Sequence, residues 1–104
     1  MTREQANIAL VQLTGRHNPM NTLAAMIGAK NFVVGSLGVS FRFKMCRKAN
    51  GCRIELDEGL DLYNLVFLKC SPKRGYNEVK VINGVYCDQL KPIFEEFTGL
   101  RVTL

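Results

Sequence analysis

The sequence predicts an α+β protein in which helices pack on an antiparallel sheet. Apolar residues repeat at helical spacing near both ends of the chain, over residues 3–28 and 84–100. Between them, short segments alternate apolar and polar residues with the period of a strand. Turn-forming glycine, asparagine and proline residues separate these segments. We therefore expect an antiparallel meander of about four strands, packed by two short N-terminal helices and one C-terminal amphipathic helix.

The length and composition are those of one globular domain. The chain has 104 residues, and we expect residues 1–104 to form a single domain. Apolar residues make up 47% and charged residues 22% of the chain, which excludes a disordered tail. No apolar run reaches the ~18 residues that a membrane-spanning helix needs. The N-terminus also lacks the apolar centre of a secretion signal, so we expect a cytoplasmic protein without a membrane partner.

The first quarter of the chain predicts two short helices. Thr2 opens a capping-box pattern, and Gly15 is placed to end the first helix. Asn18 followed by Pro19 predicts the start of a second helix, which Gly28 ends. Neither helix is long enough to be stable alone, so both need a surface to cover. Whether they pack on the sheet or extend away from it stays open.

The middle of the chain predicts the sheet. Residues 31–34 form a short strand, and residues 39–45 alternate strictly between apolar and polar side chains. The Asn-Gly pair at 50–51 is a strong signal for a two-residue hairpin turn, since both turn positions favour positive φ. This turn would place Ala49 opposite Cys52 and extend the first hairpin strand to the turn itself.

Two more strands and a helix are expected after a turn at residues 57–59. Residues 60–69 carry apolar side chains on both faces, which predicts a central strand or one covered on each side, and residues 76–82 form the next. The final helix lies within residues 84–100, where Pro92 predicts a kink or a first turn capped by an acidic residue. Its apolar stripe comprises Tyr86, Leu90, Ile93, Phe94 and Phe97.

The chain lacks the motifs of catalysis, metal binding and cofactor binding. It contains no nucleophile elbow, no phosphate-binding loop and no pair of closely spaced metal ligands. The only histidine, His17, lies far in sequence from every cysteine. We expect a protein that is not an enzyme, has no cofactor and keeps its cysteines as free thiols. The cysteines are Cys46, Cys52, Cys70 and Cys87.

Charge provides the best lead to a function. The net charge is +5, and between Lys30 and Arg53 there are six basic residues and no acidic one. On the predicted hairpin these side chains share a polar face that could neutralise phosphates. The alternative is a solvated face with Lys44 opposite Asp57 as an ion pair. Tyr76 is the ring expected to be exposed for stacking. The candidate binding residues are Arg42, Lys44, Arg47, Lys48, Arg53, Lys73 and Arg74.

Three segments resemble a family of short proteins encoded by bacteriophages and prophages. They are IGAKNFV at 27–33, DLYNLVF at 61–67 and VYCDQLKPIFEEFTGL at 85–100, in the order and spacing of that family. The resemblance extends from about Met20 onward and is most specific near the C-terminus. It implies a phage gene product in the cytoplasm of the bacterial host, and it brings no activity and no catalytic residues.

Two functions from different classes follow as hypotheses. The first is a phage accessory protein that binds a host protein or a nucleoprotein complex, for example as an anti-defence inhibitor of the anti-CRISPR kind. The second is a small basic protein that binds DNA or RNA through the face of the 42–53 hairpin. Charge reversal on that face distinguishes them, because only the second loses its affinity and its salt dependence.

Overall fold

The computed structural model describes residues 1–102 and confirms the α+β class. Two helices come first, α1 (Arg3–Thr14) and α2 (Pro19–Ile27). The strands that follow are β1 (Lys30–Val34), β2 (Gly38–Arg42), β3 (Gly51–Asp57), β4 (Leu62–Ser71) and β5 (Gly75–Val85). A single 3-10 turn, Cys87–Gln89, leads into helix α3 (Leu90–Thr98).

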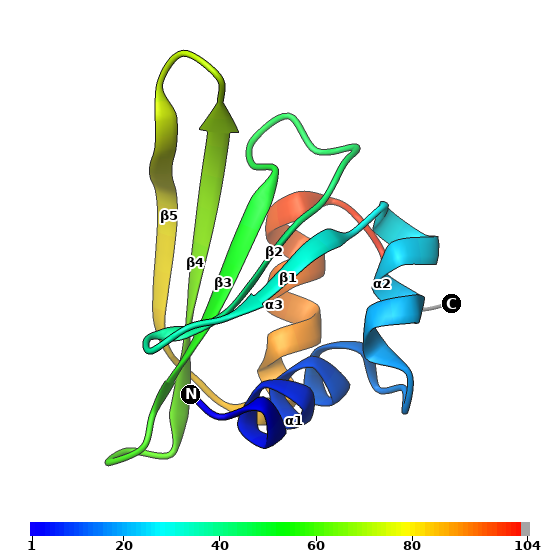
Figure 1. Ribbon diagram of the computed structural model, residues 1–104. Coiled ribbons are helices and arrows are strands. Elements are labelled where there is room, and N and C mark those ends of the chain that lie inside the picture. The colour runs from blue at the N-terminus through cyan, green and yellow to red at the C-terminus, as the bar shows by residue number, and fades with distance from the viewer. Residues whose placement is uncertain (103–104) are drawn as a thin grey trace.

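The strands form one five-stranded antiparallel sheet in the order β1-β2-β3-β4-β5, one strand more than the approximate number expected. The helices lie on one side of this twisted sheet, as Figure 1 shows, and no helix of residues 1–102 covers the other side. We call the uncovered side the open face. β4 is an interior strand with a neighbour on each side, although β3 and not β4 is the middle strand of the five. The neighbouring strands β3 and β5 pair along most of its length.

The capping signals at the N-terminus are confirmed. The Thr2 hydroxyl accepts a hydrogen bond from the Gln5 amide at 3.1 Å, and the Gln5 side chain accepts one from the Thr2 amide at 2.9 Å. Gly15 and Gly28 end the two helices with φ of 70° and 66°, values that favour glycine. Both helices pack on the sheet, because Leu13 and Leu23 are fully buried in the core that the sheet supplies.

The core lies between the sheet and the helices and is centred on an aromatic cluster. Phe94 of α3 has its ring centroid 5.5 to 6.2 Å from those of Phe41, Phe43 and Phe67. Tilted and edge-on ring pairs at these distances add to the free energy gained from burial. The alternation of the sequence therefore directs these rings inward, and the polar residues between them face away.

The predicted two-residue hairpin turn at 50–51 is wrong. β2 ends at Arg42, which lies opposite Gly51, so residues 43–50 form an eight-residue loop between β2 and β3. Met45 has a φ of 72°, which is incompatible with an extended strand. A longer hairpin would project beyond the helices and leave Phe43 without cover, whereas the loop places Phe43 in the core.

The same correction removes the predicted pairing of Ala49 with Cys52, because Cys52 lies opposite Phe41. Cys52 and Phe41 still share the buried face, since the register changes by an even number of residues and each side chain keeps its side. Lys44 and Asp57 are not cross-strand partners. Lys44 is in the loop, and Asp57 ends β3 at the other end of the sheet, opposite Leu62.

The C-terminal helix is shorter than its apolar stripe indicated. α3 starts at Leu90, so Pro92 lies in the first turn, where a missing amide hydrogen costs nothing. Asp88 does not cap it, because the preceding residues form the 3-10 turn and Gln89 occupies the cap position. Tyr86 lies outside the helix and is 60% exposed, so it does not belong to the buried stripe.

Candidate functional site

The 43–50 loop is anchored to two separate elements, α2 and β4. The Lys44 amide donates to the Ile27 carbonyl at the end of α2, at 2.9 Å, and the Phe43 amide donates to the Asn50 carbonyl at the same distance. The Asn50 side chain both donates to the carbonyl of Cys70, at 3.0 Å, and accepts from its amide, at 2.7 Å. These two hydrogen bonds resemble the pair that two residues exchange between adjacent antiparallel strands, and they hold the loop against β4.

The loop lies beside the turn that joins β4 to β5. Lys69 near the end of β4 donates from its ammonium group to the Arg47 carbonyl in the loop, at 3.1 Å. Both turns lie at the upper end of the sheet in Figure 1. Arg42 ends β2 at this level, and its partner Lys30 begins β1 there. We call this group the basic end: Lys30, Arg42, Lys44, Arg47, Lys48, Lys69, Lys73 and Arg74.

Six of the seven predicted binding residues belong to the basic end, but they do not share one flat face. Lys44 and Lys48 turn toward the helices. The Lys44 side chain passes close to Gly28, where an added Cβ would lie 3.3 Å from Lys44 Cδ. The Lys48 ammonium lies 5.3 Å from the centre of the Phe97 ring and donates to the Phe97 carbonyl. The basic end is therefore a rim around the end of the molecule.

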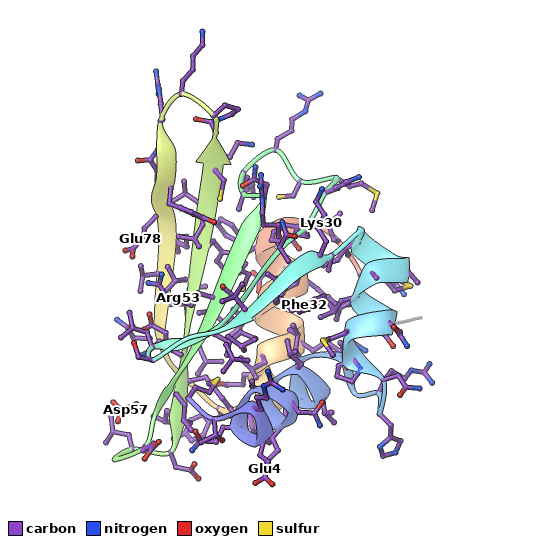
Figure 2. The ribbon with its side chains drawn as sticks, in the orientation of Figure 1. Glu4, Lys30, Phe32, Arg53, Asp57 and Glu78 are labelled. Atoms are coloured by element: carbon purple, nitrogen blue, oxygen red, sulfur yellow. The ribbon has the colours of Figure 1, made fainter. Side chains whose placement is uncertain are left out.

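Arg53 is the seventh predicted residue, and its charge is already paired. Its guanidinium contacts Glu55 at 2.7 Å and Glu78 at 3.2 Å, bridging β3 and β5 across the open face (Figure 2). Burial by itself lowers the pKa of Arg53, but the hydrogen bonds and negative charges of the two glutamates outweigh it and raise the pKa. Arg53 is therefore a structural cation of the open face.

Acidic residues gather at the opposite end of the molecule. Glu4 and Asp57 lie at the lower end in Figure 2, whereas Lys30 lies toward the upper end. Glu58 belongs to the β3–β4 turn and accepts from the Gln5 side chain at 3.3 Å, which joins α1 to this acidic end. Separation of the two signs along the sheet gives the molecule one end that attracts anions.

A groove lies on the open face next to the basic end. One row of paired residues crosses the sheet there: Arg42, Gly51, Leu68 and Glu78. Side chains that are directly opposite on adjacent strands point to the same face. The groove encloses about 360 Å³, and Tyr76 and Arg53 also line it. Nothing in the sequence pattern predicted this groove, because it depends on which strands become neighbours.

Sequence reasoning missed the full membership of the basic end. Lys30 and Lys69 belong to it, although only their charge marked them in the sequence.

Among residues 1–102, no three His, Cys, Asp or Glu side chains lie close enough to hold a metal ion. All four cysteines are free, with Cys52 buried and Cys87 exposed. Within the same residues, no helix is long and apolar enough to cross a membrane.

Comparisons with protein-family models, with curated proteins and with solved structures find no match to this chain.

Proposed function

We propose that this protein is a non-catalytic, nucleic-acid-binding protein that contacts phosphates through the basic end. The observation that carries the proposal is the gathering of eight basic residues at one end of the molecule, from three strands and the two loops beside them. The two salt bridges within residues 1–102 both belong to Arg53, which lies outside this group. Carboxylates of this chain therefore leave most of the charge of the basic end unneutralised.

The arrangement suits a phosphate backbone better than a single small anion. Lys73 and Arg74 lie at an exposed turn and Arg47 lies in the adjacent loop, so the charges follow a rim. Each phosphate neutralised along such a rim releases condensed counterions, which supplies affinity without sequence recognition. The acidic end opposite orients the protein during approach, because it is repelled by the same phosphates.

The test replaces Arg47, Lys73 and Arg74 by glutamine in one variant. These three side chains are exposed, so their loss does not disturb the core. We expect the slope of log affinity against log salt to fall by about two to three, from about 0.7 to 0.9 per lost phosphate contact. Fluorescence anisotropy with a labelled oligonucleotide at several salt concentrations measures this slope.

A matched control removes three other positive charges, at Arg3, Arg16 and Lys91, which lie outside the basic end. This control has the same net charge as the test variant, and we expect it to keep the slope of the natural protein. An equal loss in both variants would show that net charge alone attracts the nucleic acid. The absence of binding by the natural protein at low salt would contradict the proposal altogether.

A second candidate function is that of a phage accessory protein that binds a host protein or a nucleoprotein complex, including an anti-defence complex. A separate surface favours it. An apolar groove of about 380 Å³ lies between α1, α2 and β1, lined by Leu10, Met20 and Phe32 among others. Met20 and Val34, which both line the groove, are 50% and 40% exposed. Apolar side chains exposed beside a groove are typical of protein contacts.

Capture of the tagged protein from bacterial lysate, with and without nuclease, tests this second candidate. We expect a host protein that survives nuclease treatment to be lost with Met20→Asp and kept by the variant without Arg47, Lys73 and Arg74. A partner lost with nuclease, or lost only with the basic-end variant, would assign the capture to nucleic acid instead.

A further inference from the structure

Tyr76 is the aromatic residue of the open face, and it stands next to the groove. It is 70% exposed and pairs with Cys70, one level closer to the β4–β5 turn than Leu68 and Glu78. Removing the apolar ring of an exposed tyrosine from water is favourable, so a partner that covers it gains binding free energy. The flat ring can also stack against another ring. Its place beside Lys73 and Arg74 in sequence puts the ring directly below the charged turn.

The floor of the groove is low at its centre. Gly51 has no side chain, and an added Cβ would lie 3.3 Å from the Leu68 Cβ, so even one methyl group would crowd this position. Leu68 is 6% exposed and provides an apolar surface beside the gap. A flat, partly apolar ring can rest on such a floor. The volume of about 360 Å³ is at the lower end of the ~300–1,000 Å³ of small-molecule sites.

Charge at the groove is uneven in a way that suits a nucleotide. Arg42 forms one wall and belongs to the basic end, whereas Arg53 is paired with both Glu55 and Glu78, so these three side chains carry a net charge of −1. A phosphate is therefore attracted to the upper rim, near Arg42, and repelled from the Arg53 cluster. A base is uncharged, so this cluster does not repel it. The polar atoms of Ser40 and Asn31 in the lining offer hydrogen bonds to its edge.

We propose that the protein binds single-stranded nucleic acid, with phosphates along the basic end and one base stacked on Tyr76 over the groove. The inference rests on the proposed function and specifies its ligand. A base in a duplex is stacked between its neighbours and offers no face to a protein ring, whereas a single strand presents both faces. A stacking contact with the base does not distinguish deoxyribose from ribose, so single-stranded DNA and single-stranded RNA are both ligands to compare.

The experiment measures the affinity of the full chain by fluorescence anisotropy for labelled oligonucleotides of about 12 nucleotides, within the site sizes of single-strand binders. Single-stranded DNA, single-stranded RNA and duplex DNA of the same sequence are compared at one low salt concentration. We expect both single strands to bind more tightly than the duplex. The difference between the DNA and RNA arms identifies the preferred sugar.

The decisive variant is Tyr76→Leu, which keeps an apolar side chain on an exposed position and removes the ring. We expect it to weaken single-strand binding about 5- to 100-fold, the range of one base-stacking contact, and to leave duplex binding unchanged. Tyr76→Phe keeps the ring and should retain the affinity of the natural protein. Tyr86→Leu removes another exposed tyrosine, at the far end of β5, and should have no effect.

Tighter binding to the duplex, or unchanged single-strand binding by Tyr76→Leu, would overturn the inference. The proposed function would survive either result if the variant without Arg47, Lys73 and Arg74 still lost its salt slope. If no oligonucleotide bound the natural protein, the proposed function and this inference would both be wrong. Circular dichroism of each variant confirms that the fold is intact.

Discussion

At the scale of the residue, the buried thiol of Cys52 makes the free energy of unfolding depend on pH. The side chain has no exposed surface and lies in the core opposite Phe67 of β4. Burial raises the pKa of the Cys52 thiol, because a thiolate would lose its hydration there, and the charge of Arg53 opposes this only in part. The folded protein therefore keeps a proton that the unfolded chain releases above a pKa of about 9.

This difference predicts how the free energy of unfolding depends on pH. The thiol has no effect well below pH 9, and stability falls as pH rises above it, by up to about 1.4 kcal/mol per pH unit. Cys52→Ala should flatten this decline, although it lowers stability at every pH by leaving a small cavity. Urea denaturation between about pH 8 and pH 10 measures both effects.

The control for this prediction is Cys87→Ala, because Cys87 is exposed. The variant should keep the decline that begins near pH 9. Burial also raises the pKa of the Tyr63 hydroxyl, together with the charges of Cys87 and Asp61, so the effect of Tyr63 lies above a pKa of about 10. A decline just as steep between about pH 8 and pH 10 in Cys52→Ala would contradict the assignment to Cys52.

At the scale of the element, the position of the 43–50 loop depends on the side chain of its last residue, Asn50. Asn50 makes two hydrogen bonds to the backbone of Cys70, at 2.7 and 3.0 Å. It thereby extends the pairing of β3 with β4 beyond the first residue of β3, and it holds the loop where the Arg47 carbonyl accepts from Lys69, near the β4–β5 turn. The geometry of the basic end is therefore set by an uncharged residue.

Replacement of Asn50 by alanine should cost about 1–3 kcal/mol in the free energy of unfolding, since two partly buried backbone groups lose their partner. Amide hydrogen exchange within residues 43–50 should also become faster than in the rest of the sheet. Asn83→Ala, at an exposed position of β5, is the matched control and should be near neutral. Unchanged exchange in the loop would show that the contacts of Phe43 hold it in place.

At the scale of the whole molecule, one core is shared by all the helices and the sheet. Leu13 of α1, Leu65 of β4 and Phe94 of α3 are all fully buried in it. No helix has a core of its own, so separate unfolding of α1 and α2 would expose apolar area that only the sheet covers. A shared core of this size makes the molecule one cooperative unit.

Leu13→Ala should therefore lower the free energy of unfolding by about 2–5 kcal/mol and move the whole transition. Far-ultraviolet circular dichroism and tyrosine fluorescence should report the same midpoint in urea. Ile8→Ala in the same helix is the control, because Ile8 is 52% exposed and its loss should cost little. Two separate midpoints would mean that α1 and α2 unfold independently of the sheet.

The sequence by itself determined the elements whose signals are local. The caps at Thr2, Gly15 and Gly28 were predictable, and so was the strand β4 with apolar residues on both faces, because each depends on residues a few positions apart. The excess of positive charge and the exposed ring of Tyr76 were predictable for the same reason. These observations were sufficient for the fold class and for most of the candidate binding residues.

Only the tertiary structure decided where those residues lie. β2 stops at Arg42 because α2 and β4, which are distant in sequence, hold the following loop through Lys44 and Asn50. The pairing of Arg53 with Glu78 requires β3 and β5 to lie on either side of β4. An Asn-Gly pair favours a tight turn locally, but the gain from burying Phe43 exceeds that preference. Contacts between distant segments thus turned a predicted flat basic face into a basic end beside a groove.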